Sequence, residues 1–244
     1  MGRCRTVKGW PGIALLLVSL FAAPACIAED PEHPFKLSVG AYSFSDQAPA
    51  EDVNLRYTSS AGGHFWLGDF RQPVQGIQQW RSGWDQSFGD QIRISPSLQF
   101  AQGGFVGGSL NLETGPDWFV GAGLGRTNLQ PYYNLNFDPN DSYTLSAGWR
   151  RPSGAQTALQ WIQDNRLNPD QRHLHAVHQQ DLRAGRRFTT DILYKQGRVN
   201  GEMIHRLGAT LTYEWPRYFL RLAFDPKTNF TPADALRLSV GVRL

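Results

Sequence analysis

Three of the six histidines lie close together in the run HLHAVH, at positions 173, 175 and 178. On a β-strand His173 and His175 point to the same face, and a neutral imidazole is a common metal ligand. No cysteine or carboxylate accompanies them at ligand spacing, and only Asp181 follows further along the chain. The pattern therefore favours exposed histidines, and we predict no metal site; His173 and His175 are the candidates if a metal is bound.

Other candidate chemistry is sparse. The phrase Phe-Asp-Pro occurs in NFDPND (136–141) and in AFDPKTNF (223–230). Clustered loop oxygens can bind calcium, but Asp-Pro and Asn-Asp are also turn formers, and we favour turns. There is no Gly-X-Ser-X-Gly motif, and no histidine has a Ser or Asp partner at a spacing that fixes catalytic geometry. We predict no catalytic residue and no cofactor; an enzyme whose partners meet across strands stays open.

The charge balance reflects the N-terminus. The 244 residues carry 24 Lys+Arg and 21 Asp+Glu, and Arg3, Arg5 and Lys8 precede the apolar run 12–23. With the small residues around Ala28, this is typical of a secretory signal peptide. We predict that residues 1–28 are removed and that 29–34 form a short segment before a single domain at 35–244. The remaining chain has equal positive and negative charge and no cysteine, so we expect neither nucleic-acid binding nor a disulfide.

From residue 35 onward, apolar and polar residues alternate. In the last segment one face carries Leu236, Leu238, Val240 and Val242, while the other carries Arg237, Ser239, Gly241 and Arg243. Successive strand side chains point to opposite faces, so this period indicates β-strands with one apolar and one polar side. Fourteen strands are expected, at 35–43, 52–59, 63–71, 77–86, 92–101, 105–112, 117–125, 142–150, 155–163, 173–182, 186–194, 206–214, 217–225 and 235–243. Because 63–71, 77–86 and 173–182 alternate less clearly, twelve strands remain possible.

A soluble β-sandwich or a lipocalin-like barrel would also alternate, with its apolar face inward. Arginine lies at or near the polar face of most segments, which is costly unless that face meets water in a lumen. Bulky aromatics stand at the ends of the apolar faces, and the last strand runs to the end of the chain. These features favour a barrel with its apolar face outward.

Over residues 35–244 the chain resembles a bacterial outer-membrane β-barrel protein. The resemblance implies an all-β, antiparallel transmembrane barrel with a cleaved signal, short periplasmic turns and longer outer loops. It also implies location in the outer membrane, contact with its lipids and lipopolysaccharide, and insertion by the barrel-assembly machinery. Such chains usually end in an aromatic residue, whereas this one ends in Leu244. The oligomeric state is not indicated.

The alternation assigns each side chain to the lipid or to the lumen. Aromatic girdle positions are expected at the periplasmic ends for Trp118, Trp149, Tyr213 and Tyr218, and at the outer ends for Phe70 and Phe224. In the segment 63–71 we expect His64 on the lipid face, and Phe65, Leu67, Asp69 and Arg71 in the lumen. The cationic lumen candidates are Lys36, Arg56, Arg81, Arg93, Arg150, Arg221, Arg237 and Arg243.

These assignments predict a small passive channel whose arginine-lined lumen favours anionic solutes, because a low-dielectric wall focuses the field of the fixed charges. Two alternatives stay open. Arginines that pair with acids across the wall would indicate a plugged structural barrel, and an outer-membrane lipid-modifying enzyme would also be compatible with the alternation.

Overall fold

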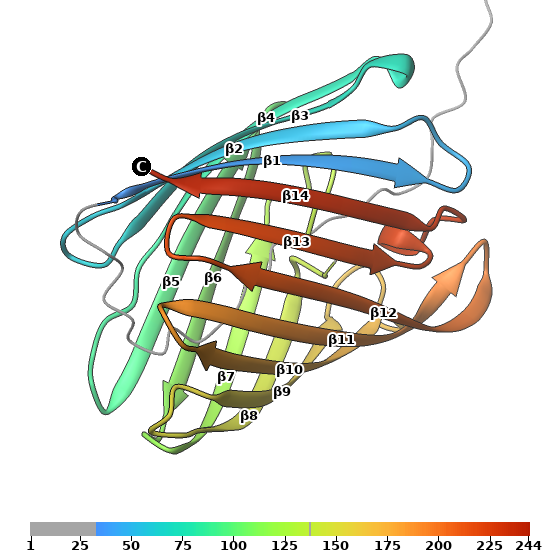
Figure 1. Ribbon diagram of the computed structural model, residues 1–244. Helices are drawn as coiled ribbons and strands as arrows, with labels where there is room; N and C mark the ends of the chain where they lie inside the picture. The colour runs from blue at the N-terminus through green and yellow to red at the C-terminus, as the bar shows by residue number, and fades with distance from the viewer. Residues whose placement is uncertain (1–32, 137) are drawn as a thin grey trace, which may run out of the picture.

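The computed structural model describes residues 33–136 and 138–244, so the expected signal peptide, and most of the short segment after it, lie outside the described residues. The described chain forms one closed barrel of fourteen antiparallel strands (Figure 1). Each strand pairs with its sequence neighbours, and β1 pairs with β14 to close the sheet. The strands are β1 (Phe35–Phe44), β2 (Ala50–Thr58), β3 (His64–Gln72), β4 (Ile77–Asp85), β5 (Ile92–Ala101), β6 (Phe105–Thr114), β7 (Trp118–Thr127), β8 (Ser142–Arg150), β9 (Gln156–Asp164), β10 (Arg172–Leu182), β11 (Arg186–Val199), β12 (Glu202–Glu214), β13 (Tyr218–Asp225) and β14 (Ala235–Arg243).

The prediction of fourteen strands is confirmed, including the three that alternate less clearly. The main difference lies in β11 and β12, which extend to Val199 and Glu202 through a region expected to be a loop. Asn200 and Gly201 connect them, both with positive φ. A two-residue Asn-Gly turn matches the twist of paired strands, so it lets the ladder continue to the turn. This long hairpin projects at one end of the barrel (Figure 1).

The two ends of the barrel differ. One end carries the start of β1 and the end of β14, together with short connections such as 115–117 and 183–185. We call it the terminal end. The opposite end carries the longer connections 128–141, 165–171 and 226–234, as well as short turns. We call it the loop end. No helix among the described residues is long and apolar enough to cross a membrane.

The outer surface of the wall is apolar. Side chains such as Val53, Leu145 and Leu222 are exposed on it, whereas polar neighbours such as Ser97 and Gln160 are buried on the inner side. A water-soluble barrel would place these side chains the other way round. The outward apolar face was expected from the alternation, and the burial pattern confirms it.

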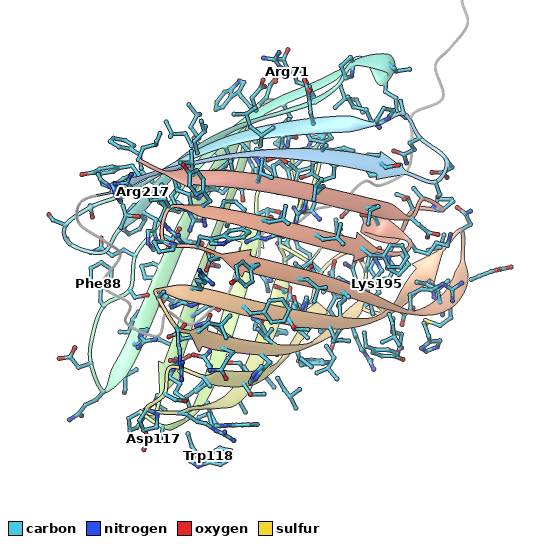
Figure 2. All side chains as sticks on the ribbon, in the orientation of Figure 1. Arg71, Phe88, Asp117, Trp118, Lys195 and Arg217 are labelled. Carbon is cyan, nitrogen blue, oxygen red and sulfur yellow. The ribbon has the colours of Figure 1, made fainter. Side chains whose placement is uncertain are left out.

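The face assignment of β3 was wrong. Phe65 and Leu67 are half exposed on the outside, and Asp69 and Arg71 pair with one another there, Nε to Oδ2 at 2.5 Å. Arg71 points away from the wall in Figure 2. His64 is not on the outer face: its Nδ1 lies 2.7 Å from Oδ1 of Asp85 on β4. Phe70, expected in the outer girdle, is fully buried inside. Large apolar residues occupy both faces of β3, so alternation alone does not decide its orientation.

Candidate functional site: the lumen and its inserted loop

The connection between β7 and β8 folds into the barrel in its described residues, 128–136 and 138–141, which we call the inserted loop. Its Tyr132 and Leu135 are almost completely buried, which is unusual for a surface connection of this length. Its contacts reach β1 to β6, β10 and β14, so it runs along a large part of the inner wall near the loop end. The inserted loop therefore occupies part of the lumen.

Two adjacent tyrosines fix the first half of this loop. Tyr132 stacks on Phe105 of β6 with ring centroids 4.4 Å apart, and its hydroxyl accepts a 2.5 Å hydrogen bond from Nε2 of Gln99. Tyr133 stacks on Phe70 of β3 at 4.5 Å. Gln79 on β4 bonds the Tyr133 backbone twice, accepting from its N–H at 2.7 Å and donating to its carbonyl at 2.9 Å. Burial, followed by the nearby Tyr42, raises the pKa of Tyr133 to about 12.

Beyond the tyrosines, the loop reaches β1 and β14. Leu135 packs in a buried cluster with Tyr42, Ala50, Phe70 and Ala235. Its carbonyl accepts a hydrogen bond from Arg237 at 3.2 Å. Asn134 donates to the side chain of Asn229, which in turn donates to the Asn134 carbonyl at 2.9 Å. The loop is therefore tied to the opposite connection, 226–234, as well as to the wall.

The end of the loop returns along β7. Asp141 accepts hydrogen bonds from the backbone and hydroxyl of Thr127 at 3.0 and 2.8 Å. Gly125 faces inward, and a Cβ there would overlap the backbone oxygen of Asn140. Gly121, Gly123 and Gly125 alternate on the inner side of β7, so this part of the wall presents no side chain to the lumen. These inward glycines are the sequence signal that could have indicated an inserted element.

At the terminal end, cations outnumber acids on the inner face. The last two inward positions of each strand at this end include seven cationic residues, Lys36, Arg56, Arg93, Arg150, Arg187, Arg221 and Arg243. The same positions include four carboxylates, Asp85, Glu113, Asp181 and Glu214. We call these seven cations and four carboxylates the basic ring. Five of the arginines that the sequence suggested as lumen candidates lie in it.

Two of the four carboxylates of the basic ring are each shared between two cations, whereas Asp181 pairs with Arg187 alone. Glu113 accepts from Arg150 at 2.6 Å and from Arg93 at 3.2 Å. Glu214 accepts from Arg243 at 2.9 Å, with Lys36 at 3.6 Å. Arg150 also lies over the Phe119 ring, 4.0 Å from its centroid. One carboxylate for two cations leaves each of these groups with excess positive charge.

Arg56 and Arg221 have no ion pair with a carboxylate in the described part of the chain. The Nε of Arg221 donates to the hydroxyl of Thr212 at 3.2 Å. The facing strand β14 places Ser239 opposite Arg221 and supplies no acid there. These two arginines are the basic-ring members whose charge the wall does not compensate by a direct contact.

Arg81 and Arg237 lie further toward the loop end, beside the inserted loop. Arg81 is 3.9 Å from Asp52 and donates to the Tyr132 hydroxyl at 3.5 Å. Arg237 lies over the Tyr42 ring in addition to bonding the Leu135 carbonyl. Arg81 and Arg237, which the sequence suggested as lumen candidates, therefore hold the loop in place. The sequence did not indicate this role.

Aromatic residues stand on the outside of the wall near both ends. Trp118 and Trp149 are adjacent, with ring centroids 5.7 Å apart, and Tyr213 and Tyr218 lie at the same end. Phe224 is exposed toward the loop end. Trp118 points away from the barrel in Figure 2. This is where girdle residues are expected; their contact with lipid stays a prediction.

The expectation of exposed histidines at 173 and 175 was wrong. Both side chains are buried on the inner face of β10 because the inserted loop covers them. Asp138 of that loop accepts from His173 Nδ1 at 2.5 Å and from His175 Nε2 at 2.9 Å. Burial alone would raise the pKa of Asp138, but the charge of His175 and the hydrogen bonds from both imidazoles hold it well below its usual value. The carboxylate comes from a loop, at no fixed sequence spacing, so the sequence could not indicate it.

Two histidines contact hydroxyls on the outer side. His178 Nδ1 lies 2.8 Å from the Thr157 hydroxyl, and His205 Nδ1 lies 2.7 Å from the Tyr194 hydroxyl. In the described residues, no carboxylate is hydrogen-bonded to the second nitrogen of either ring. Neither pair therefore has the third group that orients the base in nucleophilic catalysis.

No protein-family model and no curated protein sequence matches the chain. The fold is similar to that of the Acinetobacter baumannii outer membrane protein Omp33, with a TM-score of 0.54, 8% identity, and coverage of 87% of this chain and 98% of that one. Solved structures of the NanC porin and of Salmonella typhi OmpF also match, at 10% and 9% identity and TM-scores of 0.47 and 0.46. They cover 85% and 86% of this chain, and 100% and 96% of their own. The first likeness supports the same barrel fold.

Proposed function

We propose that the protein is a bacterial outer-membrane channel for small solutes, narrowed by the inserted loop and favouring anions through the basic ring. The apolar outer face and the aromatic residues near both ends support a membrane location, since such belts match the hydrocarbon layer and its interfaces. The terminal end faces the periplasm in this arrangement. Removal of residues 1–28, contact with lipid and lipopolysaccharide, and insertion by the assembly machinery belong to the same proposal.

The uncompensated charge of the basic ring is the observation that carries the anion preference. A barrel that needed its arginines only to stiffen the wall would pair each with its own acid. Here Arg187 has its own partner, Asp181, but Glu113 and Glu214 each serve two cations, and Arg56 and Arg221 have no carboxylate partner in the described chain. Fixed positive charge inside a low-dielectric wall attracts anions and repels cations.

The test is a reversal-potential measurement in planar bilayers under a salt gradient. Arg56→Ser with Arg221→Ser should shift the reversal potential toward cation preference, because the uncompensated charges are removed while the shared pairs remain. Arg71→Ser is the matched control, since Arg71 is an arginine on the outer face. An unchanged reversal potential in the double variant would contradict the anion proposal.

A plugged structural barrel is the second candidate, and the inserted loop favours it. Tyr132, Leu135 and Phe105 are almost fully buried where a wide pore would be open to water. A wild-type protein without conductance that conducts once residues 129–136 are replaced by a short Gly-Ser linker would support this candidate. Conductance in the wild type would exclude a complete plug. The lipid-modifying enzyme has less support, since neither outer histidine–hydroxyl pair has an orienting acid among residues 33–136 and 138–244.

A further inference from the structure

We infer that His173, His175 and Asp138 form a binding site for one divalent transition-metal ion such as Zn²⁺, which ties the inserted loop to the barrel wall. The site goes beyond the channel proposal and does not depend on it. Its ligands come from two elements, β10 and the inserted loop, that the fold brings together.

The three side chains offer convergent ligand atoms. His173, His175 and Asp138 each offer one ligand atom, these three atoms all lie within 4.8 Å of one another, and the three residues are buried. In a tetrahedral zinc site with bonds of about 2.0–2.2 Å, ligand atoms stand roughly 3.3 Å apart. The present Asp138 contacts of 2.5 and 2.9 Å need to open by less than about 1 Å to reach that spacing. The ion then takes the place of the hydrogens now shared between the imidazoles and the carboxylate.

Asp191 supplies the outer partner that metal-bound histidines usually have. Both its carboxylate oxygens lie 3.0 Å from Nδ1 of His175, the nitrogen that faces away from Asp138. A carboxylate on the second ring nitrogen fixes the tautomer and the orientation of a ligating imidazole. Asp191, on the neighbouring strand β11, thus holds the His175 ring with its Nε2 directed at the site.

The surroundings are dry and their charge is balanced. His173 is fully buried and stacks on Phe230 with ring centroids 5.6 Å apart. Its Nε2 has no hydrogen-bond partner in the described residues. Lys195, opposite His173 on β11, is bound to Asp225 at 2.7 Å. Asp138 and Asp191 therefore remain to offset the two charges of an incoming ion.

The ligand set selects the class of metal. Two imidazoles and one carboxylate suit zinc, nickel or copper, whereas calcium and magnesium prefer oxygen ligands alone. Three protein ligands leave one position for water or a small anion. A bound ion would hold the inserted loop at Asp138, five residues beyond the tyrosine that stacks on Phe70.

Binding is tested on refolded full-length barrel in detergent, treated with a chelator and titrated with Zn²⁺ alone in a calorimeter. The wild type should bind one ion per chain, and His175→Gln and Asp138→Asn should each lose this binding. Asp191→Asn should weaken it about 10–100-fold. His178→Gln is the matched control, because His178 lies on the same strand but on the outer face.

Co²⁺ provides a second measurement that reports the geometry. A tetrahedral Co²⁺ site absorbs strongly in the visible range, so the wild type and His178→Gln should show this band and Asp138→Asn should not. Asp138 belongs to a loop, so its substitution leaves the strand ladder intact. Asp138→Asn therefore still tests the site if His175→Gln fails to fold. Absence of stoichiometric Zn²⁺ binding in the wild type, or equal binding in Asp138→Asn, would overturn the inference and leave a hydrogen-bonded tether.

Discussion

Tyr133 of the inserted loop stacks on Phe70 of the barrel wall, with ring centroids 4.5 Å apart and an angle of 15° between the rings. This contact joins the inserted loop to a strand whose orientation the sequence misassigned. The position of the loop inside the barrel therefore depends on a few aromatic and hydrogen-bonding contacts with the wall.

Tyr133→Ala should increase conductance while leaving the barrel folded. The substitution removes a stacked pair that contributes about 0.5–1.5 kcal/mol beyond its buried area. It loosens the loop without changing any strand residue. Single-channel conductance is the measurement. Tyr143→Ala, on the exposed outer face of β8, is the control and should leave conductance unchanged. Equal conductance in wild type and Tyr133→Ala would show that the loop does not set the pore width.

The same tyrosine predicts an alkaline transition. Its pKa is raised to about 12 by burial and by Tyr42, so the loop is fully stabilised below pH 10, the ordinary tyrosine value. That stabilisation declines as pH rises from 10 toward 12, because ionised Tyr133 is disfavoured in the buried position. Conductance of the wild type should rise over this interval, whereas Tyr133→Phe should not show this component. A similar rise in both proteins would assign the transition to other groups.

Gly125→Ala tests how closely the loop lies against β7. A Cβ at this position would overlap the backbone oxygen of Asn140, so the end of the loop must move away from the wall. We expect faster proteolysis within residues 128–141 and increased conductance. Gly108→Ala serves as control, since its new Cβ would meet Ser97 O only at 3.2 Å. Unchanged proteolysis in Gly125→Ala would contradict the close approach.

Glu113→Gln should increase anion preference. The change removes the one carboxylate that serves both Arg93 and Arg150, so it adds a net positive charge to the basic ring. The lost charged hydrogen bonds should also cost about 1–3 kcal/mol of unfolding free energy. Reversal potential and urea unfolding measure the two effects. Glu51→Gln on the outer face of β2 is the matched control, and a shift there of the same size would rule out a pore effect.

The outer face of the wall should tolerate a polar substitution less well than the inner face. Leu222→Arg places a cation on the exposed apolar face and should destabilise the folded barrel by about 2–4 kcal/mol if the site lies near the bilayer centre. Ser239→Gln, on the inner face opposite Arg221, should fold nearly normally. Unfolding in lipid vesicles provides the comparison. Equal losses in both variants would argue against a membrane-facing outer surface.

The sequence by itself determined the barrel class and the strand number. Alternation such as that of Leu236, Leu238 and Val240 specifies which face of β14 is apolar, because strand side chains have a period of two. The apolar face was correctly assigned to the outside at both ends of the chain. Local pattern is sufficient there because each segment has only one face that tolerates lipid.

Tertiary structure alone decided the orientation of β3 and the contents of the lumen. Phe65 and Phe70 occupy opposite faces of β3, so the pattern was ambiguous; Phe70 is inside because Tyr133 packs on it. Asp138 meets His173 and His175 only because a loop folds back across the barrel. Contacts between a loop and distant strands leave no periodic trace in the sequence, since they depend on which inner-wall positions are open to receive it.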